Sequence, residues 1–258
     1  MRNVLTIAGR ELRSIFTSPV AYVVMTGFLL LCGWFFFNLV ARFNMLVQMY
    51  SSYEAMGDTA GRLNLNEFVI APLLHNMAVV LLIVVPMITM RSFAEEKRLG
   101  TYELLLTSPI GTGQIVLGKL LASGTFVGLM IASSGIFGVI LSIWGNPEIG
   151  VLLAGYAGLL LVGLTFVAIG LFASSLTENQ IIASVVGLVI TLLLFVIAWP
   201  ADSAGDILGP VLRHLAVTEH FDQMVRGIVS TSSLVYFFSM IAGWTFLTQR
   251  SVESIRWR

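Results

Sequence analysis

The side chains best suited to binding a partner lie in one short stretch, 91–109, between two long uncharged runs. Its first half is charged, with Arg91, Glu95, Glu96, Lys97 and Arg98, and its second half places Leu99, Tyr102 and Leu106 at helical spacing before Pro109. Such an amphipathic helix docks into a groove on a soluble partner, with apolar anchors inside and charges at the rim. Alternatively it lies on lipid or shields neighbouring helix ends. The acidic pair disfavours a purely lipid role, because the inner leaflet is itself negative.

A second stretch imitates a phosphate-binding loop. Gly113, Gly118 and Lys119 have the required spacing, but Leu120 stands where a Ser or Thr hydroxyl would ligate Mg²⁺. Such a loop also joins a buried strand to a soluble helix, whereas this one leads into an apolar run. The sequence therefore argues against ATP binding here, and Lys119 is expected to snorkel to the inner membrane surface.

Other catalytic and metal-binding patterns are weak. His75, with Met45, Met49 and Met77, could suggest copper, but methionine in an apolar chain more often fills gaps in packing. The single cysteine, Cys32, is expected to be a small buried side chain. We expect no catalytic, cofactor or metal site in this chain.

Composition defines the class of protein. Of the 258 residues, 57% are hydrophobic and only 11% are charged, whereas soluble domains carry about 25% charged residues. So few charges cannot cover a water-exposed surface, so lipid must cover most of it. The formal net charge of zero argues against a nucleic-acid partner.

Uncharged runs long enough to cross a bilayer predict an all-α polytopic membrane protein with six transmembrane helices. The expected spans are about 20–40, 70–90, 120–144, 151–173, 181–200 and 229–248. A tight turn at Asn146-Pro147-Glu148 joins the third span to the fourth. Carboxylates are missing from the centres of the spans, which disfavours an ion-coupled carrier.

The N-terminal residues, 2–16, have a helical period instead of the pattern of a signal peptide. One face collects apolar side chains, namely Leu5, Ala8, Leu12, Ile15 and Phe16, and Arg10 lies opposite. This pattern predicts an interfacial helix before the first span. The alternative is a plain cytosolic extension of that span.

Basic residues indicate the orientation. With the N-terminus inside, ten of the 14 Lys and Arg residues fall in cytoplasmic segments, which predicts that both termini are cytoplasmic. The main inside loop is then 91–118, and the outside pieces are 41–67 and an extracellular segment, 202–226. Small residues at Gly124 and Gly128 in the third span, and at Ala154 and Gly158 in the fourth, permit close helix packing within the bundle or across a dimer.

The inside loop also resembles a known signature. The pattern Arg91-Ser92-Phe93, Glu95-Glu96-Lys97, Gly100-Thr101, Glu103-Leu104-Leu105-Leu106-Thr107 and Pro109 is similar to that of ABC-2-type transporter permeases, and especially of their gliding-motility branch. Two later segments match in order: Ile169 to Thr177 with Asn179-Gln180-Ile181, and His220-Phe221-Asp222 with Arg226 to Val229 and Val235-Tyr236-Phe237. The resemblance covers almost the whole chain, 1–258, as one transmembrane domain.

The resemblance implies that the segment from Glu95 to Ser108 is a coupling helix, which fits into a separate ATPase subunit. The implied contacts are Glu95, Glu96, Arg98, Gly100, Thr101, Glu103, Leu104 and Leu106, with a minor contact at Ser175, Glu178 and Asn179. ATP and Mg²⁺ would then bind the ATPase, present in two copies, and this chain would be a non-catalytic subunit.

Further partners implied are a second permease chain, identical or homologous, an auxiliary extracytoplasmic protein, and the lipid of a bacterial cytoplasmic (inner) membrane. The expected function is substrate export driven by ATP hydrolysis on the partner. Two alternatives are a non-transporting anchor that recruits an ATPase to a cell-envelope machine, and an ion-coupled secondary carrier. No residue pattern specifies the substrate.

Overall fold

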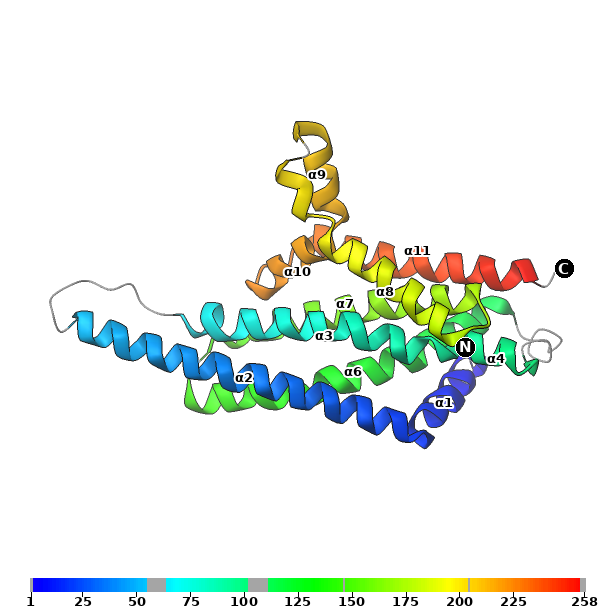
Figure 1. The fold of residues 1–258 in the computed structure, drawn as a ribbon, viewed down its shortest axis with the longest axis horizontal. Helices are drawn as coiled ribbons and strands as arrows, with labels where there is room; N and C mark the ends of the chain where they lie inside the picture. Colours follow the sequence, from blue (N-terminus) through cyan, green and yellow to red (C-terminus); the bar gives the residue numbers. More distant parts are fainter. Residues whose placement is uncertain (1, 55–63, 102–110, 146, 204, 256–258) are drawn as a thin grey trace.

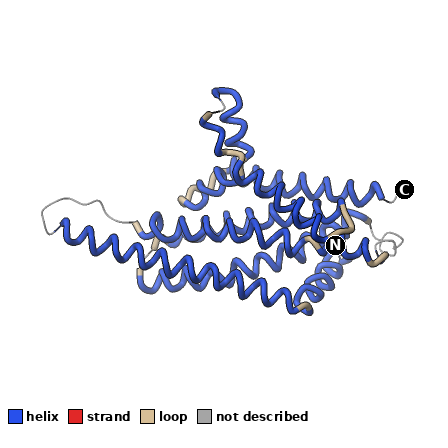
Figure 2. The backbone as a smooth tube through the Cα atoms, viewed as in Figure 1, coloured by secondary structure: helices blue, strands red, loops and turns tan. Residues whose placement is uncertain are grey.

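The structure is a computed structural model, which describes residues 2–54, 64–101, 111–145, 147–203 and 205–255. Throughout these residues the regular structure is helical, without a strand (Figure 2). The helices, in chain order, are α1 (Arg2–Thr17), α2 (Pro19–Glu54), the π-helix η1 (Asn66–Ile70), α3 (Ala71–Thr89), α4 (Arg91–Arg98), α6 (Thr112–Trp144), α7 (Ile149–Leu176), α8 (Gln180–Val196), the 3-10 helix η2 (Trp199–Asp202), α9 (Gly205–Leu215), α10 (Val217–Val225) and α11 (Thr231–Ile255).

The long helices form an elongated bundle with α7 at its centre. Helix α7 packs against α3, α6, α8, α10 and α11, and α11 runs along the bundle beside it (Figure 1). Helix α2 lies on the outside, with Val23, Trp34 and Phe37 each about two-thirds or more exposed, at 71%, 66% and 70%. An apolar outer face of this kind is suited to lipid. Cys32 is fully buried, as predicted.

Five helical stretches in the described residues are long and apolar enough to cross a membrane: Pro19–Tyr50, Asn66–Arg98, Thr112–Trp144, Ile149–Leu176 and Gln180–Ala201. Each contains one predicted span, so five of the six predictions are matched. The sixth, 229–248, falls mostly in α11, which is 25 residues long. Helix α11 is not among the five because it is more polar, so the sixth span stays a prediction.

Two predicted loops are partly helical, and their boundaries were wrong. The outside loop, 41–67, begins with helix, because α2 continues to Glu54 and neither Gly nor Pro interrupts residues 41–54. The inside loop, 91–118, contains α4 and the first turns of α6, which begins at Thr112. The length of an uncharged run predicts which residues can lie in the bilayer, but it does not predict the residue at which a helix ends.

The segment 202–226 contains the short helices α9 and α10. Figure 1 shows α9 projecting from the side of the bundle. Its apolar residues Leu208 and Val211 are exposed, whereas Phe221 and Met224 of α10 are buried against the bundle. The glycines predicted for helix packing contact other helices of this chain. Gly124 and Gly128 face Leu164 and Leu160 of α7, and Gly158 faces Met224 of α10. Ala154 is 9% exposed.

Candidate functional site

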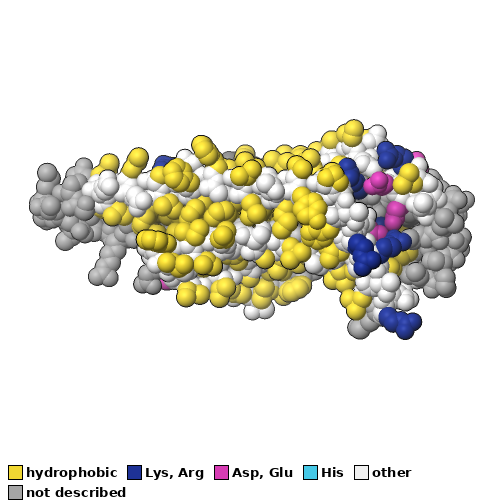
Figure 3. Space-filling view, turned by 90° about the horizontal axis from the view of Figure 1, so that it is seen from below, with side chains coloured by type: hydrophobic (Ala, Val, Ile, Leu, Met, Phe, Trp, Pro, Cys, Tyr) yellow, Lys and Arg dark blue, Asp and Glu magenta, His cyan; other side chains and the backbone are white. Residues whose placement is uncertain are grey.

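The charged side chains gather at one end of the molecule. Figure 3 shows basic and acidic groups together there, while the long flank beside them is mostly hydrophobic. Helices α1 and α4 and the C-terminal part of α11 lie at this end (Figure 1). The predicted partner-binding stretch therefore belongs to a polar surface that several helices build together.

One serine of α7 bonds to the backbone where α3 meets α4. Only Met90 separates α3 from α4, and Pro86 within α3 has no N–H to continue the helical ladder. At the junction itself, Ser174 Oγ of α7 accepts hydrogen bonds from the N–H groups of Phe93 (3.0 Å) and Ala94 (3.1 Å) and donates to the carbonyl of Met90 (2.8 Å). A displacement of α4 is thus coupled to both α3 and α7.

A buried lysine ties α4 to two further helices. Lys119 of α6 has only 1% of its side chain exposed, and its Nζ lies 2.8 Å from Glu96 Oε1 and 3.2 Å from Glu11 Oε1 of α1. It also donates to the carbonyl of Ser92 at 2.6 Å and sits 5.1 Å from the centre of the Phe93 ring. The prediction that Lys119 reaches the membrane surface was wrong, because two carboxylates hold it inside the protein.

Gly118, the glycine beside this lysine, has a packing role that accounts for its place in the sequence that resembles a phosphate-binding loop. A Cβ on Gly118 would lie 2.6 Å from Ile7 Cγ2 and 3.3 Å from the carbonyl oxygen of Val4. Gly118 is therefore the place where α1 crosses α6. The predicted N-terminal helix is present, and its partly buried face includes Leu12, Ile15 and Phe16 as expected, but Leu5 is 67% exposed and Ile7 packs in its place.

The predicted coupling residues divide into two groups. Arg98, Gly100 and Thr101 are exposed and Glu95 is half-buried, so they are available to a partner. Glu96 is turned inward to Lys119, with only 18% of its side chain exposed. Glu103, Leu104 and Leu106 lie outside the described residues. Helix α4 ends at Arg98, and Gly100 has a φ of 69°, a left-handed conformation that favours glycine and stops the helix there.

The second predicted contact segment lies beside α4. Lys97 Nζ donates to the carbonyl of Ser175 at 2.5 Å. The Ser175 side chain is fully buried, whereas Glu178 and Asn179 are exposed. Asn179 caps α8, because its Oδ1 accepts from the N–H groups of Ile181 (2.9 Å) and Ile182 (3.4 Å). The structure therefore brings the two segments, far apart in sequence, to one surface.

Glu11 and Ser174 were not predicted as residues of this site, and Lys119 was not predicted to point inward. A weak signal existed for Lys119 and Glu11, since each is a charge on an otherwise apolar helix face. Ser174 lies in the matched segment Ile169 to Thr177, but neither its type nor its spacing indicates a bond to α4. His75, considered for copper, approaches Asp222 at 3.6 Å and Ala71 O at 2.8 Å. The described residues contain no group of three His, Cys, Asp or Glu side chains that could hold a metal ion.

Comparison with known proteins places the chain in a family. A family model described as ABC-2 family transporter protein matches residues 5–248, nearly the whole chain. No curated protein matches it.

Proposed function

The chain belongs to the ABC-2 family of transporter proteins and is an integral membrane protein, and we propose that it is the permease subunit of an ATP-driven exporter. In this proposal a separate ABC ATPase, in two copies, binds ATP and Mg²⁺ and docks on the polar end of the bundle. A second permease chain, identical or homologous, completes the pathway. We place the chain in the gliding-motility branch of the family and in a bacterial cytoplasmic membrane, on the motifs of its sequence.

The observation that carries the proposal is the attachment of α4. Exposed residues at its end, Arg98 to Thr101, stand next to Glu178 and Asn179, so one partner can touch both segments. Behind that surface, Ser174 links α4 to α7, and Lys119 links it to α1 and α6. A push by the ATPase would therefore reach four helices without passing through a flexible loop. Such coupling requires that nucleotide favour one arrangement of these helices over another.

The proposal also covers the membrane topology. Helix α11 would be the sixth span, because it runs along the bundle beside α7 (Figure 1). Both termini would then lie on the cytoplasmic side with α4, which agrees with the excess of Lys and Arg in those segments. The short helices α9 and α10 would lie at the opposite membrane surface.

The test is affinity purification of the full chain from its native membrane in mild detergent, with identification of the proteins that accompany it. We expect an ABC ATPase, and at least a fivefold loss of it in Arg98→Glu. Arg42→Glu, the same charge reversal on exposed α2, is the matched control and should retain the ATPase.

Two outcomes would contradict the proposal. A parent chain that is stable and arrives without any ATPase in several detergents would overturn the permease assignment and favour an ion-coupled carrier. Recovery of the ATPase undiminished by Arg98→Glu combined with Glu103→Arg would show that docking uses another surface.

A further inference from the structure

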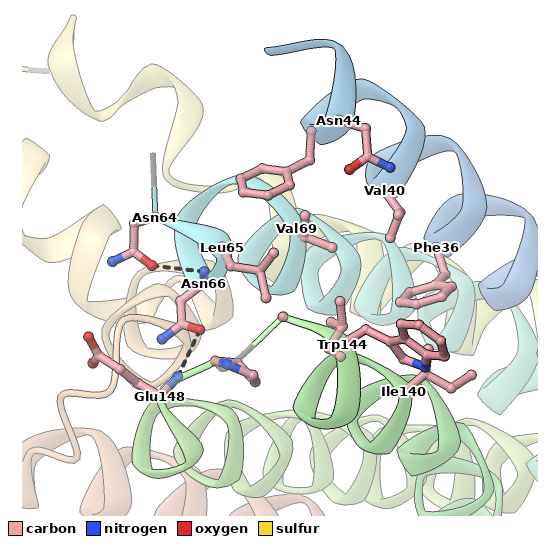
Figure 4. Close-up of a pocket in the computed structure, with 14 residues that line it drawn as sticks. Phe36, Val40, Asn44, Asn64, Leu65, Asn66, Val69, Ile140, Trp144 and Glu148 are labelled. Atoms are coloured by element: carbon pink, nitrogen blue, oxygen red, sulfur yellow. Dashed lines mark hydrogen bonds between the residues drawn. The ribbon is translucent and has the colours of Figure 1, made fainter. Parts of the chain in front are cut away.

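A cavity of about 890 Å³ lies at the end of the bundle away from α4. Helix α2 supplies one wall and the last turns of α6 another, and the residues that precede α3 and α7 complete it. Figure 4 shows two unlike ends: Asn64, Asn66 and Glu148 on one side, and Phe36, Ile140 and Trp144 on the other. The cavity is therefore amphipathic, with aromatic and aliphatic walls and a small polar end.

One buried group at the polar end lacks a partner. Asn66 is only 7% exposed, and its Oδ1 accepts a hydrogen bond from the N–H of Glu148 at 3.3 Å. Its Nδ2 is buried and has no hydrogen-bond partner in the protein. A buried donor of this kind is costly unless an acceptor reaches it. Nδ2 exposes almost no surface, so a bound molecule reaches it when the Asn66 side chain rotates toward the cavity, and an oxygen offered there would remove that cost.

The charges of the lining restrict the head group of such a molecule. Glu148 is the one charged residue among the described lining residues. Arg226 lines an adjoining hollow that shares Asn66 and Glu148, but it is paired with Asp222 at 2.8 Å. A phosphate would meet a carboxylate without an available cation, and an ammonium group cannot accept a hydrogen bond from Asn66. A hydroxyl can accept from Asn66 and donate to Glu148.

We propose that this cavity binds a neutral amphiphile with a hydroxyl-rich head, such as a glycosyl lipid. Its hydroxyls bond to Asn66, Glu148 and the neighbouring amide of Asn64, and its hydrocarbon chain lies along the apolar walls (Figure 4). Trp144, with 86% of its surface exposed, stands at the aromatic end. The site requires no ATPase, so it stands or falls independently of the proposed permease function.

The experiment uses the full chain in phosphatidylcholine nanodiscs and follows tryptophan fluorescence, with Trp144→Phe to isolate the signal of that residue. The probes are dodecyl maltoside below its critical micelle concentration, dodecylphosphocholine with the same tail, and free maltose. We expect saturable binding of the maltoside at least tenfold tighter than that of either other probe. The comparison with maltose separates a lipid head group from a free sugar.

The variant Asn66→Leu removes the unpaired donor and should weaken maltoside binding at least fivefold. Asn38→Leu, the same change on α2 at a residue outside the cavity lining, should leave it unchanged. Asn66→Leu deletes both the buried unpaired Nδ2 and the acceptor of the Glu148 N–H, so the melting temperature of each variant is measured and binding is compared well below it, which distinguishes lost binding from unfolding.

Three results would overturn the proposal. Equal binding of dodecylphosphocholine would show a site for hydrocarbon alone, and equal binding of maltose would show that the tail has no part. If Asn66→Leu leaves the affinity for the maltoside unchanged, the side-chain amide of Asn66 does not contact the head group.

Discussion

The Nζ atom of Lys119 lies 2.8 Å from Oε1 of Glu96, inside the end of the bundle that faces the proposed ATPase. Glu11 approaches the same nitrogen at 3.2 Å, so one cation serves two carboxylates from different helices. The lysine side chain is almost fully buried, whereas the side chains of Glu11 and Glu96 are 19% and 18% exposed. The three side chains therefore set the position of α4 relative to α1 and α6.

Lys119→Met should destabilise the protein strongly. Methionine keeps the length of the side chain but leaves the exposed Arg10, at 2.9 Å from Glu11 and 3.8 Å from Glu96, as their remaining cation. Breaking the buried pairs in this way costs about 3 kcal/mol or more. The measurement is the free energy of unfolding in mixed micelles. Addition of Glu96→Gln should recover part of the loss, because it removes one uncompensated charge.

Arg250→Met is the control for Lys119→Met. Arg250 pairs with Glu253 at 3.0 Å but has 64% of its side chain exposed, so its loss should cost less than about 1 kcal/mol. Equal effects of the two substitutions would contradict a special role for the buried lysine.

Ser174→Ala should loosen the α3–α4 junction. The substitution leaves the N–H groups of Phe93 and Ala94 without their acceptor, at a cost of about 1–3 kcal/mol. Amide hydrogen exchange at these two residues should accelerate. Ser175→Ala is a matched neighbour, because the Ser175 hydroxyl bonds only within α7, to the carbonyl of Phe172 at 2.7 Å. If both variants exchange equally fast, Ser174 does not hold the junction.

Gly170→Ala should disturb the same junction from a position one turn before Ser174 on α7. A Cβ at Gly170 would overlap the hydroxyl of Thr89, with Thr89 Cβ at 2.9 Å. Overpacking of this kind costs about 1–3 kcal/mol. Gly135→Ala on α6 is the control, since nothing lies within 4 Å of its added methyl group. The control should be neutral or stabilising by up to about 1 kcal/mol, and thermal unfolding in detergent would compare the two.

The stability of the α9–α10 corner should depend on pH through His220. Its Nε2 faces the carbonyl of His214 at 3.1 Å and therefore carries the proton, while Nδ1 lies 3.2 Å from Ser233 Oγ. Burial lowers the pKa of His220, and the bond to the His214 carbonyl opposes this only in part. The unfolded chain, with the ordinary value of 6.5, therefore binds the proton more readily than the folded protein.

Stability should accordingly be complete above about pH 6.5 and fall as the pH drops through that value toward the lower folded pKa. Melting temperatures between pH 7.5 and 5.5 would show the decline, and His220→Gln should flatten it while keeping an N–H toward His214. An unchanged pH profile in His220→Gln would assign the decline to other groups.

Much of the fold was predictable from composition and the length of the apolar runs. Each expected span except the last falls within a helix that can cross a membrane. A run of about 20 apolar residues is costly to expose to water, and in the bilayer a helix satisfies all of its backbone hydrogen bonds. The errors lie at the ends. Residues 41–54 carry charges and were taken as loop, although α2 continues to Glu54 and neither Gly nor Pro interrupts it there.

The sequence by itself determined that this is a helical membrane protein, where its exposed charged stretch lies, and to which family it belongs. Only the tertiary structure decided that Lys119 points inward, that Ser174 holds α4, and that Asn66 is left with an unpaired donor. The first set depends on the hydropathy and order of neighbouring residues. The second set depends on which helices contact one another, and the sequence does not show this. Gly118 is an example: its lack of a side chain matters only because Ile7, 111 positions earlier, packs against it.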